Sequence, residues 1–305
     1  MFLKAAFKNA SAFVQILMLL AVISVCSLFF LSMFHVFLLI EIKEGTSPEA
    51  LKDIMENMSN YPELMRGMQF LQTLLIFLAP AIICAWLYSD DYKEYLHADQ
   101  PVYLPTAVWA AVSMIVVVPF LNLTYEFNQQ MALPEALRGL ENWMKASEAE
   151  AGKLTDLLLD TKNISTIIFN FLAICVIAAI SEEFMFRGLL QTIFGKAIRN
   201  PHLLIWLVAI LFSAIHLQFY GFIPRMLLGA WLGYLMYYTK TIWIPVLAHF
   251  TNNFYGVALY YLFRDSPDKM QKIDAVGAGS TWWLAIASLA LFLFCFTQLK
   301  KTVNS

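Results

Sequence analysis

The chain has 305 residues, of which 60% are apolar and 14% carry a charged side chain, and its formal net charge is −2. Soluble domains are roughly 45–50% apolar and about 25% charged, so a mean hydropathy of +0.65 excludes a soluble enzyme and a disordered protein. The continuous apolar runs disfavour a transmembrane barrel, and the small net charge gives no reason to expect nucleic acid as a partner. The composition predicts an all-α integral membrane protein.

Apolar segments of about the length that spans a bilayer follow one another along the chain. We place eight of them, near residues 12–40, 67–89, 102–122, 164–190, 203–218, 222–239, 241–262 and 280–298. The first follows Lys4 and Lys8 but is too long for a signal peptide and lacks a small-residue cleavage site, so we interpret it as an uncleaved span. The expected fold is a polytopic bundle of about eight helices in the lipid bilayer.

The charges between the spans predict an orientation. The segments 41–66 and 123–163 each have a net charge of −3, from three basic against six acidic side chains and four against seven. The short connecting segments on the other side carry lysines and arginines, which predicts cytoplasmic N- and C-termini by the positive-inside rule. The short loops and the lack of extra domains predict a bacterial cell (inner) membrane.

Each of these two acidic segments contains an apolar stripe with helical spacing. The stripes consist of Leu51, Ile54, Met55 and Met58 in the first segment and of Leu137, Leu140 and Met144 in the second. We expect two amphipathic helices that lie on the outer membrane surface and cap the bundle. An internal duplication and a role in gating substrate access are the alternatives.

The fourth apolar segment contains two adjacent glutamates. A charged group in hydrocarbon costs at least ~2.5–3.5 kcal/mol and therefore marks a candidate functional site. Glu183 and Arg187 are i, i+4 neighbours and can pair, whereas Glu182 points about 100° away from that pair. A carboxylate without a partner suits a general base. The alternative is a structural ion pair, with Glu182 reaching to a lipid headgroup.

The fifth and seventh apolar segments each contain a histidine, and residue counting places the first of these, His216, at a depth similar to that of Glu182. If helix four runs to about residue 199, Glu182 lies ~25 Å and His216 ~20 Å from the inner ends of their helices at 1.5 Å per residue. His249 shares one helix face with Asn253, but at ~12 Å it is shallower and requires tilt or a later helix start. A lone histidine is more often a core residue, yet the co-occurrence of these groups favours a site.

Three motifs formed by these residues resemble those of the CAAX-processing and bacteriocin-processing (CPBP, or Abi) intramembrane proteases. The motifs are E-E-x-x-x-R at Glu182, Glu183 and Arg187, F-x-x-x-H at Phe212 and His216, and H-x-x-x-N at His249 and Asn253. The family includes type II CAAX prenyl endopeptidases and lysostaphin-resistance-protein A-like proteins. Its domain would cover residues 163–258, preceded by three spans with two amphipathic segments in 1–162 and followed by an outer loop and a final span in 259–305.

The resemblance implies a CAAX-protease-like intramembrane endopeptidase that acts on a membrane-associated peptide or protein. Glu182 would activate water, and His216 would hold that water or a metal. His249 and Asn253 would stabilise the oxyanion or complete a metal shell.

The remaining motif residues would support this site, since Glu183 and Arg187 would fix the helix and Phe212 would pack beside it. By donor type alone, Glu182, His216 and His249 could instead form a zinc site with two histidines, one carboxylate and an open position for water. No H-E-x-x-H or G-x-S-x-G sequence occurs. A metalloprotease and a metal-free glutamate–histidine mechanism both remain open, with preference for the second.

Two other functions compete with proteolysis. One is a bacteriocin-immunity or binding protein on the same scaffold, which would use the same residues. The other is an ion- or proton-coupled transporter in which Glu182 and His216 relay charge, although the two halves show no matching interrupted helices. Outside the motifs, Asn170 is expected to bond across helices. Arg225 is expected to extend outward to the membrane surface, and contact with the substrate is the alternative.

Overall fold

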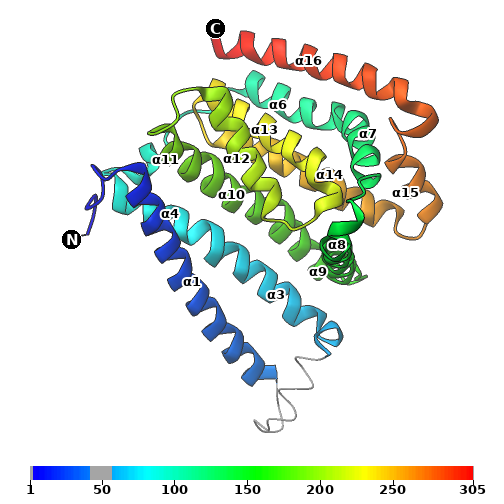
Figure 1. Ribbon diagram of the computed structural model, residues 1–305, viewed down its shortest axis with the longest axis horizontal. Coiled ribbons are helices and arrows are strands. Elements are labelled where there is room, and N and C mark those ends of the chain that lie inside the picture. Colours follow the sequence, from blue (N-terminus) through cyan, green and yellow to red (C-terminus); the bar gives the residue numbers. More distant parts are fainter. Residues whose placement is uncertain (1–2, 42–56, 305) are drawn as a thin grey trace.

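The computed structural model describes residues 3–41 and 57–304, which form helices and no strand. Long helices lie side by side in the bundle that Figure 1 shows. The predicted all-α class and membrane helix bundle are confirmed. The first expected amphipathic stripe, at Leu51, Ile54 and Met55, lies outside the described residues.

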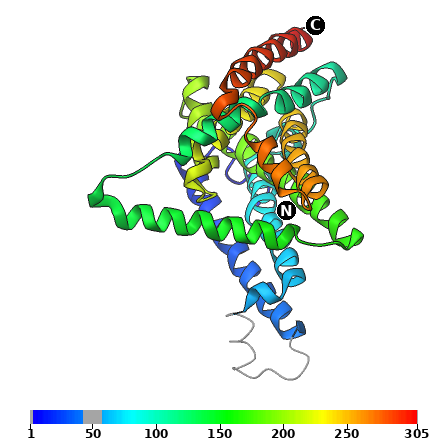
Figure 2. The same ribbon diagram turned by 90° about the vertical axis from the view of Figure 1, so that its right-hand side faces the viewer.

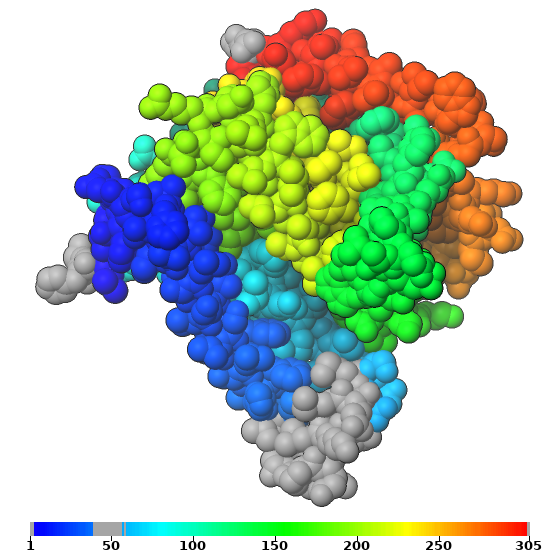
Figure 3. All heavy atoms as spheres, viewed as in Figure 1, coloured from blue at the N-terminus to red at the C-terminus, as the bar shows by residue number. Residues whose placement is uncertain are grey.

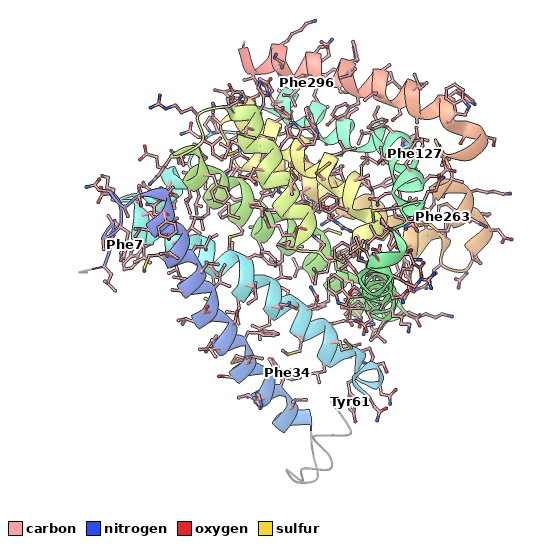
Figure 4. All side chains as sticks on the ribbon, in the orientation of Figure 1. Phe7, Phe34, Tyr61, Phe127, Phe263 and Phe296 are labelled. Atoms are coloured by element: carbon pink, nitrogen blue, oxygen red, sulfur yellow. The ribbon has the colours of Figure 1, made fainter. Side chains whose placement is uncertain are left out.

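Two long helices form one side of the bundle. They are α1 (Ala12–Glu41) and a second helix made of α3 (Pro62–Thr73), the π-helical turn η2 (Leu74–Leu78) and α4 (Ala79–Tyr88), preceded by the 3-10 turn η1 (Met58–Asn60). Gln15 joins them, because its carbonyl accepts a hydrogen bond from the Tyr88 hydroxyl at 2.6 Å. Phe34 and Tyr61 lie at one end of this pair and Phe7 at the other (Figure 4), so the two helices run antiparallel.

A single long helical span, Ile164–Gly195, carries the two glutamates. It consists of α9 (Ile164–Asn170), the π turn η4 (Phe171–Ile177), α10 (Ala178–Glu183), the π turn η5 (Phe184–Leu190) and α11 (Gln191–Gly195). The glutamates therefore stand at the end of a short α-helical stretch between two π turns. Such turns are rare and frequently mark functional sites.

Three further helices pack around this span. They are α12 (Pro201–Ala214), α13 (Phe222–Thr239), which follows the 3-10 turn η6 (Phe219–Gly221), and α14 (Trp243–Phe263). Asn200 begins α12, because its side chain accepts hydrogen bonds from the backbone N–H groups of His202 and Leu203. The chain between α4 and α6 contains the short helix α5 (Tyr92–Tyr95) and lies over the start of α14.

The third predicted span is bent. It consists of α6 (Leu104–Val116) and α7 (Val118–Gln129), which meet at 42°. Pro119 explains the break, since proline lacks an N–H donor and clashes with the preceding turn. Gly277 packs against the bend with φ +92°, and a Cβ there would lie 2.1 Å from the Pro119 carbonyl oxygen. The chain then closes with α15 (Pro267–Asp274), the 3-10 turn η7 (Gly279–Thr281) and α16 (Trp282–Asn304).

The second expected amphipathic helix is present as α8 (Arg138–Leu159), preceded by the 3-10 turn η3 (Glu135–Leu137). Figure 2 shows α8 running across the other helices rather than along them. Of its predicted stripe, Met144 is buried, whereas Leu137 and Leu140 are exposed. Its C-terminal end is held by Arg66, a buried side chain whose guanidinium donates to the carbonyls of Leu157, Leu158 and Asp160.

The count of eight spans is not confirmed. Four described helices are long and apolar enough to cross a membrane, or five if the bent α6–α7 pair is one span. The helix α12 has 14 residues, and α13 and α14 include charged and polar residues that lower their hydropathy. Both described chain ends lie at one end of the bundle, where Ala5 bonds the Trp86 carbonyl and Thr302 bonds Thr106, which fits termini on one side of the membrane.

Candidate active site

The four residues expected to do chemistry line one cavity of ≈ 440 Å³. Glu182 comes from α10, His216 follows the C-terminal end of α12, and His249 and Asn253 lie one turn apart on α14. Residues separated by up to 71 positions in the sequence therefore meet inside the bundle. The exposed fraction of the side chain is 15% for Glu182, 8% for His249 and 28% for His216.

One oxygen of Glu182 faces both imidazoles. Its Oε2 atom lies 4.0 Å from His216 Nε2 and 3.9 Å from His249 Nε2. No lysine or arginine of the described residues lies within 4.0 Å of this carboxylate. Glu182 is therefore in place to accept a proton from a molecule bound between it and the two rings.

Backbone and side-chain acceptors orient the two rings. His216 Nδ1 lies 2.8 Å from the Phe212 carbonyl oxygen, which can only accept, so Nδ1 carries a proton. In the neutral ring, Nε2 then presents a lone pair to the cavity. His249 Nδ1 lies 2.8 Å from Glu183 Oε1 and donates to it. With its proton on Nδ1, the His249 ring presents a lone pair on Nε2 to the cavity when it is neutral and an N–H donor when it is charged.

Glu183 and Arg187 form a buried framework behind these rings. Both side chains have no exposed surface, and Arg187 donates to Glu183 Oε1 at 2.7 Å and to the Gly229 carbonyl at 2.9 Å. The guanidinium lies 4.6 Å from the centre of the Phe212 ring. Phe212 also contacts His216 edge-on at 5.1 Å between ring centres, so the expected ion pair and the expected aromatic support form one unit.

The start of α14 explains how His249 reaches Glu182. Thr241 and Ile242 are 2% and 0% exposed, and the Ile242 N–H bonds the His97 carbonyl at 3.0 Å. The segment between α4 and α6 therefore covers the two residues that precede α14 and fixes where this helix begins. The helix begins at Trp243, two residues after the start of the apolar segment, which agrees with a later helix start, one of the two adjustments, with tilt, that the sequence leaves for His249.

Asn253 joins α14 to the π turn before the glutamates. Its amide N–H donates to the Ile174 carbonyl in η4 at 3.0 Å, and its Oδ1 accepts from Asn252 at 3.3 Å. One of its two N–H donors is thus structural, while the second remains for a ligand. Asn170 bonds across helices as expected, donating to the Leu158 carbonyl and the Tyr261 hydroxyl.

The cavity is also lined by polar residues outside the motifs, namely Tyr125, Glu148, Gln218, Arg225 and Asn252. Arg225 lines it instead of extending outward, so that expectation is wrong, and Gln218 and Glu148 accompany it. Glu148 belongs to α8 and accepts a hydrogen bond from the Tyr220 N–H at 3.1 Å, which attaches α8 to the turn before α13. In Figure 3, α8 stands at the surface beside the segment that begins α13. Amphipathic spacing predicts α8 itself, but no local signal predicts that Glu148 turns inward.

A metal requires closer ligands than this arrangement provides. Ligand atoms of a tetrahedral zinc lie about 3.3 Å apart, given bonds of about 2.0–2.1 Å, whereas the separations from Glu182 Oε2 are 3.9 and 4.0 Å. In the part of the chain that the structure describes, no group of three His, Cys, Asp or Glu side chains is arranged to hold a metal ion. We therefore derive no step through a metal.

Comparison with known proteins agrees with the motifs. Residues 164–255 match the family described as "Type II CAAX prenyl endopeptidase Rce1-like", and this confirms the resemblance over that segment. The chain is also 24% identical over 187 residues to the uncharacterized protein YpbD of Bacillus subtilis (strain 168), an alignment that covers 59% of this chain and 80% of the relative. No solved structure matches.

Proposed function

We propose that this membrane protein, whose residues 164–255 form an Rce1-like domain, is an endopeptidase that hydrolyses a peptide bond in or next to the bilayer. The family match supports a protease of the CAAX type. The observation that carries the proposal is the position of Glu182 Oε2 opposite the Nε2 atoms of two histidines in one cavity. A general base, an acceptor and a donor are then within reach of one water molecule.

Glu182 and His216 activate the water in this mechanism. Since His216 Nδ1–H is bonded to a carbonyl, its Nε2 accepts one water hydrogen and orients the molecule. Glu182 takes a proton as the water oxygen attacks the carbonyl carbon of the scissile bond. The protonated Glu182 then returns this proton to the leaving nitrogen as the C–N bond breaks, which yields a carboxylic acid and an amine.

His249 and Asn253 stabilise the negative oxygen that forms during attack. His249 donates through Nε2 when its ring is charged, and its Nδ1–H is bonded to Glu183, which orients the ring. Asn253 donates through the amide hydrogen that Ile174 leaves free. Donors fixed before the reaction contribute most because they need no rearrangement as charge develops. Glu183, Arg187 and Phe212 position this donor and the base.

The substrate is a membrane-associated peptide or protein, since the cavity lies among membrane helices. We propose cytoplasmic N- and C-termini and a bacterial inner membrane as the location, from the charge distribution between the spans. We also propose three parts of the chain: 1–162, a protease core at 163–258, and 259–305.

Terminal proteomics of membranes tests the function. Cells that produce the wild-type protein are compared with cells that produce Glu182→Gln, and Glu150→Gln is the control because Glu150 is exposed on α8. We expect new peptide N-termini in membrane proteins with the wild type and the control, and their absence with Glu182→Gln.

A bacteriocin-immunity role predicts a different result. In that case no new N-termini depend on Glu182, while resistance to a bacteriocin-like peptide still depends on the intact chain. That combination would refute the proposed protease function.

A further inference from the structure

The guanidinium of Arg225 faces the active-site cavity without an acidic partner. Among the residues that the structure describes, no carboxylate lies within 4.0 Å of it. We propose that Arg225 binds a carboxylate of the substrate and so determines which peptide bond reaches Glu182. This inference rests on the proposed function and identifies the chemical group that the site recognises.

Two contacts hold the guanidinium in place before any ligand binds. Arg225 donates to both the backbone carbonyl and the side-chain Oε1 of Gln218. Its Nη2 atom lies 3.5 Å from where a Cβ of residue 221 would stand, so the group rests on the backbone of Gly221. Since an arginine has five N–H donors and Gln218 takes two, donors remain for a ligand in the cavity.

The nearby acids are engaged elsewhere. Glu148 lines the same cavity and its charge acts on Arg225 through space, but it forms no ion pair with Arg225 within 4.0 Å, and its Oε2 accepts the Tyr220 N–H. Glu183 is occupied by Arg187 and His249. A guanidinium among membrane helices is costly unless it serves a partner or a ligand, and its planar fork matches a carboxylate with two parallel hydrogen bonds.

The position of Arg225 fits a role in substrate placement. A second cavity of ≈ 760 Å³ lies between α8, η4 and α14. The two cavities share six residues, namely Glu182, His216, Gln218, Arg225, Asn252 and Asn253. A peptide whose scissile bond lies at Glu182 can therefore extend into both cavities while a carboxylate reaches Arg225. The carboxylate is either the C-terminal one or an Asp or Glu side chain.

Binding and cleavage of four synthetic peptide libraries test the proposal. The peptides end in a free carboxylate or a carboxamide, and each type is made with and without Asp and Glu. Binding is measured with the full-length Glu182→Gln protein in liposomes, and cleavage with the wild type. Three variants are made both in the wild type and in the Glu182→Gln protein: Arg225→Gln, Arg225→Lys and the exposed-site control Arg138→Gln. Thermal melting in detergent verifies that each variant is folded.

We expect loss of the recognised carboxylate to weaken binding to the Arg225-containing protein by about 10-fold or more. Arg225→Gln is expected to lose this discrimination, with a raised KM and little change in kcat, and Arg225→Lys to retain part of it. If only the carboxamide ending weakens binding, the C-terminal carboxylate is the group; if only the absence of Asp and Glu does, it is a side chain.

Two results would overturn the inference. One is equal binding of all four libraries by the Arg225-containing protein. The other is an Arg225→Gln variant that weakens the binding of every library by the same factor, or that lowers only kcat. Failure of the protease proposal gives a separate result, because the wild type would then cleave no library while carboxylate-dependent binding by Glu182→Gln persisted.

Discussion

The adjacent glutamates allow a structural role to be separated from a catalytic role, because Glu183→Gln and Glu182→Gln make the same chemical change one residue apart. Glu183 Oε1 accepts hydrogen bonds from Arg187 and from His249 at 2.7 and 2.8 Å, and no part of the Glu183 side chain is exposed. Glu182 keeps 15% of its side-chain surface and has no arginine or lysine of the described residues within 4.0 Å.

The two substitutions therefore differ in cost. Glu183→Gln leaves Arg187 charged and buried, with the Gly229 carbonyl and the Phe212 ring as its remaining contacts. Breaking a buried pair in this way costs about 3–5 kcal/mol. At roughly 2–4 °C per kcal/mol, the melting temperature falls on the order of 10 °C. Within the described ranges, Glu182 faces only the two histidine rings, at 3.9 and 4.0 Å, and no lysine or arginine, so we expect Glu182→Gln to abolish cleavage and to lower the melting temperature far less than Glu183→Gln does.

Thermal melting of the purified proteins in detergent measures the difference. Glu183→Gln/Arg187→Met serves as the control, because removing both charges is expected to recover part of the lost stability. Equal losses of melting temperature for the two single variants would refute this division between a structural and a chemical glutamate, as would a double variant less stable than Glu183→Gln.

Three further predictions concern the oxyanion, metal and α8. Asn253→Ala is expected to raise the reaction barrier by about 3–4 kcal/mol and to leave slow but measurable cleavage; single-turnover kinetics give the value, and wild-type rates would contradict it. Elemental analysis is expected to find substoichiometric zinc, and chelation to leave cleavage largely intact, whereas one tightly held zinc per chain that is needed for activity would contradict the metal-free mechanism. Arg66→Gln is expected to speed amide hydrogen exchange at residues 150–159 but not in α16, because Arg66 bonds the last carbonyls of α8.

Much of the site follows from helical spacing in the sequence. The i, i+4 relation predicts the ion pair of Glu183 and Arg187 and the shared face of His249 and Asn253, and both are present. The depth argument also brings Glu182 and His216 to one level. These relations are local to one helix or depend only on counting residues from a helix end, so they need no knowledge of tertiary contacts.

Other features depend on contacts that the sequence does not encode locally. Of the two π turns on either side of α10, η4 lies in a uniformly apolar stretch without proline, and η5 contains Arg187 and Gly188, neither of which predicts a π turn by itself. The number of spans also stays a prediction, because hydropathy alone does not tell a helix buried against protein from one that crosses lipid. Arg225 could reach either outward or inward from the first turn of α13, and only the position of Gln218 decides it.

The site contains two acid–base pairs of residues: a closed pair, Glu183 and Arg187, which are bonded to each other, and an open pair, Glu182 and Arg225, which are not. Glu183 and Arg187 neutralise each other without exposed surface, and they orient His249 through the same carboxylate oxygen. Glu182 and Arg225 face the cavity but are not within 4.0 Å of each other or of another opposite charge, histidines aside, among the described residues. An ion pair between Glu182 and Arg225 would occupy the general base and the anion-binding group at the same time. Since each is attached to a different helix and Gln218 holds the arginine, the bundle keeps them apart, and a substrate carboxylate can neutralise Arg225 while Glu182 stays ready to take a proton from water.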